Sequence, residues 1–188
     1  MMYKVIKEYF RRKALKSVNG ECGTGLISLE KVKIAGFLYK MESAEDIEAL
    51  KEVVEVFNGS SIKFSGIAAQ TGKVFRSEEE RAGFADFCSA NNIVFIERKD
   101  IDWKGVPSME ECTPFLNKKY DLFLSLNDNG NYTLNYLSMF VKAGYHVGMQ
   151  NNTKMPYNVV MEKSSREMPL GEYIGKVLEY LSGMKTEV

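Results

Sequence analysis

Residues 120–150, YDLFLSLNDNGNYTLNYLSMFVKAGYHVGMQ, decide the fold of this chain. They open with an almost continuous apolar run, Tyr120–Leu126, which is typical of a strand covered on both faces of a parallel sheet. After an Asn-rich turn, apolar residues recur at helical spacing over residues 132–143, and Gly144 is expected to end that helix. Residues 146–150 complete the unit as a second strand. This pattern predicts a right-handed crossover between parallel strands.

The rest of the chain repeats the same alternation of strand and helix. Ser43 and Ser77 are candidate N-caps, and Pro114 lies inside an expected helix. We expect one three-layer α/β domain, residues 26–188, with a mainly parallel, Rossmann- or flavodoxin-like sheet of about six strands. The expected strands are 32–39, 62–69, 93–97, 120–126, 146–150 and 158–162, and the expected helices are 44–57, 78–88, 108–116, 132–143 and 170–184.

Residues 1–25 predict a basic amphipathic helical arm followed by a Gly-rich link. An anionic membrane surface, RNA or an acidic protein would all fit such an arm. In the alternative, which we favour, the arm packs on the domain by its apolar stripe and keeps its basic residues in water. Against the single carboxylate Glu8, the basic side chains are Lys4, Lys7, Arg11, Arg12, Lys13 and Lys16.

Composition excludes several classes of protein. Lys plus Arg and Asp plus Glu both number 25, so no overall charge favours nucleic acid. One histidine and three dispersed cysteines do not predict a zinc site or a disulfide framework, and we expect no metal and no cofactor. Without a long apolar run or a signal-peptide pattern, the expected compartment is the cytoplasm.

Polar side chains follow two neighbouring strands of the predicted sheet. Ligands of parallel sheets bind beyond the carboxyl ends of the strands, so these residues are the candidate ligand site. In the interpretation that we favour, they only form turns and cap a helix, and Asp128 would repel an anion. The candidates are Asn127, Asp128, Asn129 and Asn131 after the first strand, and Gln150, Asn151 and Asn152 after the second.

Reactive groups elsewhere do not form a recognisable catalytic set, and no GxGxxG or GxxxxGK[ST] phosphate motif is present. His146 is a lone histidine and is expected to be structural or exposed, not a general base. Cys88 is expected in the core, and acidic neighbours raise the thiol pKa expected for Cys112. Trp103, in a polar loop, fits equally well a ligand or partner anchor and a cover for the edge of the core.

The chain resembles a family of small α/β bacterial proteins of unknown function. The resemblance rests on the basic arm 4–16, the loop Asp102-Trp103-Lys104-Gly105, residues 120–125 and residues 143–148. It implies a flavodoxin- or Rossmann-like fold and supplies no activity. Asp121–Gly148 is also distantly similar to the amino-terminal half of heptosyltransferase-type glycosyltransferases. Those enzymes catalyse between two such domains, and 188 residues leave no room for the second.

Two functions follow as hypotheses. We expect a non-catalytic cytoplasmic binding or interaction protein, because the catalytic constellations are missing and the arm is basic. The alternative is a small enzyme, resembling a glycosyltransferase half-domain, that binds a nucleotide or sugar near residues 127–131 and 150–152. The sequence predicts no catalytic residue for it.

Overall fold

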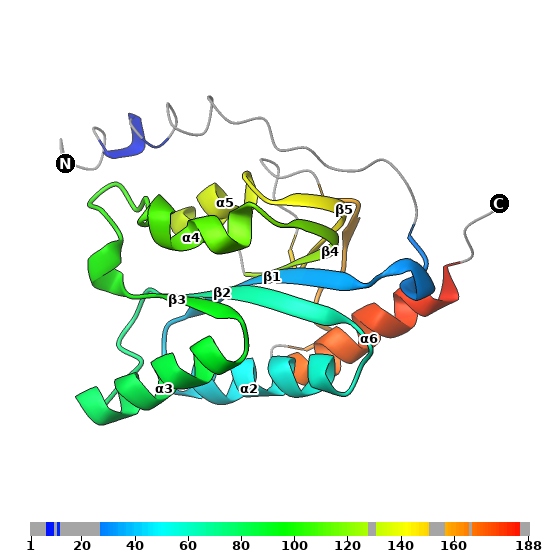
Figure 1. Cartoon of the computed structure of the whole chain (residues 1–188), viewed down its shortest axis with the longest axis horizontal. Helices are drawn as coiled ribbons and strands as arrows, with labels where there is room; N and C mark the ends of the chain where they lie inside the picture. Colours follow the sequence, from blue (N-terminus) through cyan, green and yellow to red (C-terminus); the bar gives the residue numbers. More distant parts are fainter. Residues whose placement is uncertain are drawn as a thin grey trace.

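The computed structural model of the chain describes residues 7–9, 11, 27–127, 131–150, 157–165 and 167–184. Within these ranges, six strands form one sheet in the order β3-β2-β1-β4-β5-β6, and all neighbouring strands run parallel (Figure 1). The predicted α/β class is therefore confirmed. The strands are β1 Ile34–Met41, β2 Lys63–Gln70, β3 Ile93–Ile96, β4 Lys119–Leu126, β5 Lys142–Gly148 and β6 Val159–Val160.

Helices cover both faces of the sheet. On one face lie α2, α3 and α6, and on the other lie α4 and α5 (Figure 1). Strand β4 shows why both faces need cover, because Leu122 and Leu124 join one apolar cluster while Tyr120 and Phe123 join the other. The helices are α2 Glu45–Asn58, α3 Glu78–Ala90, α4 Met109–Leu116, α5 Tyr132–Ser138 and α6 Leu170–Gly183, with short 3₁₀ turns η1 Leu29–Lys31 and η2 Arg98–Asp100.

The order of the strands reverses at the centre of the sheet. From β1 the chain moves outward through β2 to β3, then returns and places β4 against the other side of β1. From β4 it moves outward again, through β5 to β6. The two central strands therefore send their following helices to opposite faces, which opens a crevice beyond their carboxyl ends.

The predicted helix 132–143 is wrong in its second half. Helix α5 ends at Ser138, and β5 already begins at Lys142, four residues before the predicted strand. Ala143 pairs with Tyr120 on β4, so a buried parallel ladder takes the residues that helical spacing had assigned to the helix. Gly144 lies within β5 and is not a left-handed helix cap; among the described glycines, only Gly105 has a positive φ, 94°. The last strand is also shorter than expected, Val159–Val160.

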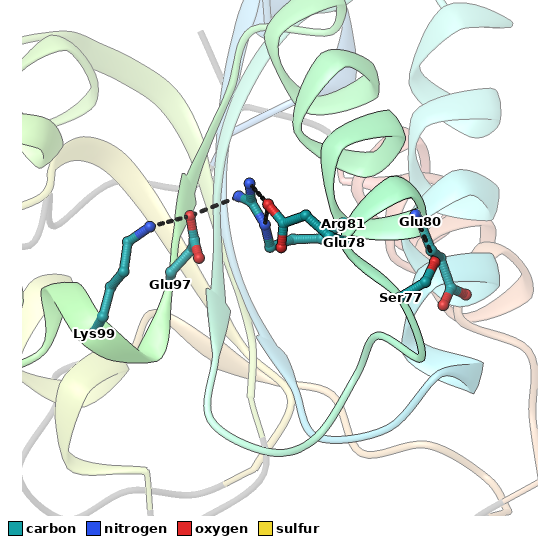
Figure 2. Close-up of polar contacts among 6 residues, drawn as sticks. All are labelled: Ser77, Glu78, Glu80, Arg81, Glu97 and Lys99. Atoms are coloured by element: carbon teal, nitrogen blue, oxygen red, sulfur yellow. Dashed lines mark hydrogen bonds and ion pairs between the residues drawn. The ribbon is translucent and has the colours of Figure 1, made fainter.

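One of the two predicted N-caps is confirmed. The Ser77 hydroxyl accepts a hydrogen bond from the Glu80 amide at 3.1 Å, as Figure 2 shows at the start of α3. The Glu80 carboxylate accepts from the Arg76 amide at 2.8 Å, one residue earlier than in a regular capping box. Ser43 is not an N-cap, because Ala44 occupies that position in α2.

A partly exposed chain of ion pairs ties α3 to the loop that follows the edge strand β3. Arg81 bridges Glu78 in its own helix and Glu97 after β3, the latter at 2.9 Å (Figure 2). Lys99 contacts the same Glu97 carboxylate at 3.0 Å. The hydrogen bond from Arg81 lowers the pKa of Glu78 below its usual value. These contacts fix the position of α3 more than they add to stability, since exposed pairs are weak.

Replacing each predicted capping serine by alanine separates a true cap from an apparent one. Ser77→Ala is expected to lower the free energy of unfolding by about 1 kcal/mol, because the Glu80 amide loses its acceptor. Ser43→Ala is expected to change it by less than about 0.5 kcal/mol. Urea unfolding followed by circular dichroism measures both, and equal losses would contradict the assignment of the caps.

Gly66 on β2 is expected to tolerate no side chain. It pairs with Phe37 on β1, and a Cβ atom at Gly66 would lie 2.3 Å from the Phe37 ring. Gly66→Ala is therefore expected to destabilise the protein by about 1–3 kcal/mol through overpacking. The matched control is Gly83→Ala in α3, where nothing lies within 4 Å of the added atom. That change is expected to stabilise the protein by about 0.5–1 kcal/mol in the same urea titration.

Candidate functional site

An open cavity of about 970 Å³ lies at the carboxyl ends of β1, β4 and β5. Its walls come from the first turns of α2, the residues that follow β5, and the segment that leads into α6. The cavity therefore occupies the crevice at which the strand order reverses, on the side of the sheet that α2 and α6 cover. Its polar lining includes the carboxylates of Glu42, Glu45, Asp46, Glu48, Glu52 and Glu162 and the ammonium groups of Lys40 and Lys163.

The turn between β1 and α2 is closed by a carboxylate of the chain itself. Asp46 accepts hydrogen bonds from the amides of Glu42 and Ser43, at 2.7 and 2.8 Å. Its second oxygen accepts from the Tyr39 hydroxyl at 2.8 Å. In dinucleotide-binding sheets, the amides at this position hold the phosphates. Here these two amides donate to the Asp46 carboxylate. A phosphate would therefore be repelled by the charge of Asp46 and would find no free amide donor on Glu42 or Ser43.

At the start of α6, a backbone amide also donates to a carboxylate of the chain itself. The Gly171 amide, in the first turn of that helix, donates to the Glu52 carboxylate of α2 at 3.0 Å. This contact joins two helices 119 residues apart in the sequence and forms one wall of the cavity. The positive ends of both helix dipoles that face the cavity are therefore met by side-chain carboxylates.

The two lysines of the lining already have partners. The Lys40 ammonium lies 3.0 Å from the Glu42 carboxylate. The Lys163 ammonium donates to the main-chain oxygen of Met168 at 2.7 Å, which holds the loop before α6. Both lysine side chains thus contact other residues of the cavity wall, and the described lining carries an excess of negative charge.

The sequence-predicted ligand residues divide between two places. Gln150 lines the cavity. Asn127 is buried on the opposite face, where its amide nitrogen lies 3.5 Å from the Asn135 side-chain oxygen of α5. Asn131 is the N-cap of α5, and its side chain accepts from the Leu134 amide at 3.1 Å. Asp128, Asn129, Asn151 and Asn152 lie outside the described residues.

The acidic lining is the part of the site that the sequence analysis missed. Glu45 and Glu162 are far apart in the chain and line the same cavity because β1 and β6, which precede them, end at the same edge of the sheet. A signal was present in the carboxylates at positions 42, 45, 46 and 48 directly after a strand. Acidic residues at the start of a helix usually complement its dipole, which is why this signal did not single out a site.

A family model described as a family of unknown function, DUF6913, matches residues 3–183. The chain belongs to this family. The resemblance to small α/β proteins of unknown function is thereby confirmed over nearly the whole chain. A search of the curated proteins finds no match. In the part of the DUF6913 chain that the structure describes, every helix is too short or too polar to cross a bilayer.

Among the described residues of this DUF6913 protein, the two cysteines and the histidine lie in the core. His146 is 2% exposed within β5 and packs against the Phe123 ring, whose centroid is 5.3 Å away. Its ring nitrogens form no hydrogen bond with the described residues. Burial lowers the pKa of His146, and the nearby main chain of Ala143 acts in the opposite sense. Burial raises the pKa of Cys88 and of Cys112 to about 12, so both thiols stay protonated at neutral pH.

The described part of the basic arm contacts the domain through a basic residue. Arg11 donates to the main-chain oxygen of Lys104 at 2.6 Å, whereas Tyr9, from the apolar stripe, is 62% exposed. The loop after η2 offers the Arg11 guanidinium a carbonyl and an aromatic ring. The packing of the apolar stripe stays a prediction, because Met2, Val5, Ile6 and Phe10 lie outside the described residues. Trp103, in the same loop, is 45% exposed. The basic residues Lys4, Arg12, Lys13 and Lys16 lie outside the described ranges.

The buried imidazole predicts how stability depends on pH. The pKa of His146 is lowered from 6.5 in the folded state, so the unfolded chain binds the proton more readily. The free energy of unfolding is expected to fall as the pH drops below about 6.5, and to level off below the folded pKa. Urea titrations between pH 5.5 and 8 measure this slope. In His146→Leu the slope should flatten, and an unchanged slope would assign the effect to other groups.

Proposed function

We propose that this chain is a binding protein that holds a small, positively charged ligand in the cavity at the carboxyl ends of β1, β4 and β5. The observation that carries the proposal is the lining of that cavity, in which carboxylates from two segments, residues 42–52 and Glu162, outnumber the lysines. The site lies where parallel sheets of this topology hold their ligands. A primary amine, a polyamine or a guanidinium group has the matching charge and hydrogen-bond donors.

Two carboxylates are best placed to meet such a ligand. Glu45 opens α2 and Glu162 precedes α6, so they face the cavity from different walls. Both side chains belong to exposed residues, and their charges are partly screened by water. Each carboxylate therefore attracts a cation only modestly. A ligand with two or more ammonium groups is expected to bind more tightly than a monoamine, because it can contact both carboxylates.

The position of the reactive groups supports binding without chemistry. The described cysteines belong to the apolar clusters, His146 is buried within β5, and none of them lines the cavity. Their pKa values are shifted toward the uncharged forms, which are poor nucleophiles and poor acids at neutral pH. Of the carboxylates that line the cavity, Asp46 and Glu52 already accept hydrogen bonds that hold the β1–α2 turn and the start of α6.

A second candidate is a nucleotide- or sugar-binding enzyme, as the distant similarity to glycosyltransferases suggested. The strand order 3-2-1-4-5-6 favours it, because dinucleotide-binding sheets have that order. Carboxylates also accept hydrogen bonds from sugar hydroxyls. The Asp46 carboxylate at the β1–α2 turn weighs against the phosphate part of such a ligand. Under this second candidate function, a neutral sugar without a phosphate is therefore the ligand that fits the cavity best.

Thermal unfolding of the full-length protein distinguishes the two candidates. Spermidine at about ten times its dissociation constant is expected to raise the melting temperature by about 3–5 °C. UDP-glucose and ATP, at the same concentration, are expected to have no effect. Stabilisation by a sugar or nucleotide and none by any amine would overturn the proposal and favour the enzyme.

Substitutions in the cavity test the location of binding. Glu45→Gln and Glu162→Gln are each expected to reduce the spermidine shift by half or more, because each removes a charge without changing shape. The matched control is Glu55→Gln, an exposed position on α2 that does not line the cavity. Equal losses in all three variants would mean that spermidine binds by general charge attraction and not in the cavity.

A further inference from the structure

A second open cavity, of about 490 Å³, lies at the amino ends of the strands, at the edge of the sheet opposite to the acidic cavity. Four strand starts contribute to its lining. Ile34 opens β1 and Lys63 opens β2, while Asn92 and Lys118 directly precede β3 and β4. The end of α2 and the turn that follows it complete the wall. We call this cavity the amino-edge pocket.

The charged side chains that line the amino-edge pocket are both cationic. Among its lining residues, all of which the structure describes, the charged ones are Lys63 and Lys118. Neither lysine forms an ion pair within the described part of the chain. The Asp121 carboxylate, which accepts from the Ile34 amide at 3.0 Å, is not part of the lining. An anion would therefore meet two ammonium groups in this pocket and no lining carboxylate.

One of the two ammonium groups is held in place by a buried hydroxyl. Lys118 donates through Nζ to the Ser65 hydroxyl at 3.2 Å. Ser65 is 4% exposed and donates in turn to the main-chain oxygen of Asn92 at 3.0 Å. An ammonium group has three N–H donors, so this contact leaves two of them for a ligand. The partner of Lys118 is uncharged, and its positive charge therefore stays uncompensated at the pocket.

The rest of the lining includes a large apolar part. Phe57 and Phe64 both line the pocket, and their ring centroids lie 5.2 Å apart. Ile34, at the same opening, is 39% exposed although it is a large aliphatic side chain. Covering such a side chain with an apolar group is favourable, because it removes hydrocarbon surface from water. The pocket thus combines cationic groups with an apolar surface.

The end of helix α2 also reaches the pocket, and free carbonyl groups at a helix end would repel an anion. Here these carbonyls have partners. The Glu55 oxygen accepts from the Gly59 amide at 2.9 Å, and the Phe57 oxygen accepts from the amide and the hydroxyl of Ser60 at 3.0 and 2.8 Å. Lysines near a helix end also complement its dipole, which is the role open to Lys63 and Lys118 in the absence of a ligand.

We propose that the amino-edge pocket binds a small organic anion, in which a carboxylate or phosphate group is carried on an apolar body. Lys63 and Lys118 meet the anionic group, because ammonium groups donate charge-assisted hydrogen bonds to carboxylate and phosphate oxygens. The apolar body covers Ile34 and the exposed parts of the two phenylalanines. This site is separate from the acidic cavity and takes a ligand of the opposite charge.

An NMR titration of the isotope-labelled, full-length protein measures both the affinity and the place of binding. Phenyl phosphate and phenylacetate test the two anionic groups, whereas inorganic phosphate lacks the apolar body and benzyl alcohol lacks the charge. At least one aromatic anion is expected to bind saturably and to shift the amide signals of residues 62–65 and 118. Inorganic phosphate is expected to bind about tenfold more weakly, and benzyl alcohol not at all.

Three results of this titration would overturn the proposal. The first is that neither aromatic anion binds saturably. The second is that benzyl alcohol or inorganic phosphate binds as tightly as the aromatic anions. The third is that the shifted signals belong to the acidic cavity, residues 42–52, instead of the amino-edge pocket. The aromatic anion that binds more tightly identifies the preferred anionic group.

Variants separate a ligand site from general charge attraction. Lys63→Gln and Lys118→Gln are each expected to weaken binding of the aromatic anion by about threefold to tenfold. The matched control is Lys142→Gln, which removes an exposed lysine at the start of β5, outside the lining, and should bind like the wild type. Ile34→Thr keeps a β-branched side chain and is expected to weaken binding of the aromatic anion but not of inorganic phosphate.

Two results with these variants would also overturn the proposal. An equal loss of affinity in Lys142→Gln would mean that the anion is attracted by surface charge in general. Wild-type affinity in both Lys63→Gln and Lys118→Gln, with a lower free energy of unfolding, would mean that these lysines only complement the helix ends.

Discussion

The pairing of β1 with β4 is the contact on which the rest of this structure depends. It joins two stretches of chain separated by more than eighty residues, in a register that sets Phe37 opposite Leu124. The Asp121 carboxylate fixes the start of that register, since it accepts from the amides of Lys33 and Ile34 at 2.8 and 3.0 Å. Once these strands are adjacent, the sheet grows outward on both sides, and the crevice at their carboxyl ends follows from geometry alone.

What the crevice accepts is decided by side chains and not by the fold. A sheet of this order ordinarily presents free amides and helix dipoles to an anion. Here the carboxylates of Asp46 and Glu52 accept hydrogen bonds from amides at these positions, and the remaining carboxylates make the cavity lining negatively charged. The same backbone arrangement is thereby less suited to a phosphate, and its negative lining is the basis on which we propose a cationic ligand. The strand order that this sheet shares with nucleotide-binding proteins therefore gives little guidance to function.

The local sequence pattern predicted helices and strands well where a single physical effect determined it. The apolar run of β4 and the Ser77 cap were visible because burial on both faces and a side-chain acceptor each leave a short-range signature. The boundary between α5 and β5 was missed because Val141 and Ala143 fit helical spacing and a buried strand equally well, and only pairing with β4 decides between them. The cavity and the contact of Arg11 with the Lys104 carbonyl were beyond such rules, since each joins residues that only the tertiary fold brings together.

The two outer strands differ from the central ones in a way that affects how molecules of this protein meet each other. Strand β3 has four residues and β6 has two, against eight in β1, β2 and β4. Exposed strand edges invite further strands from other chains, which is a common beginning of aggregation. An edge of two residues provides few backbone groups for such growth, and the ion pairs around Glu97 place charge beside the other edge. Concentrated solutions of the folded protein should therefore resist conversion into cross-β assemblies.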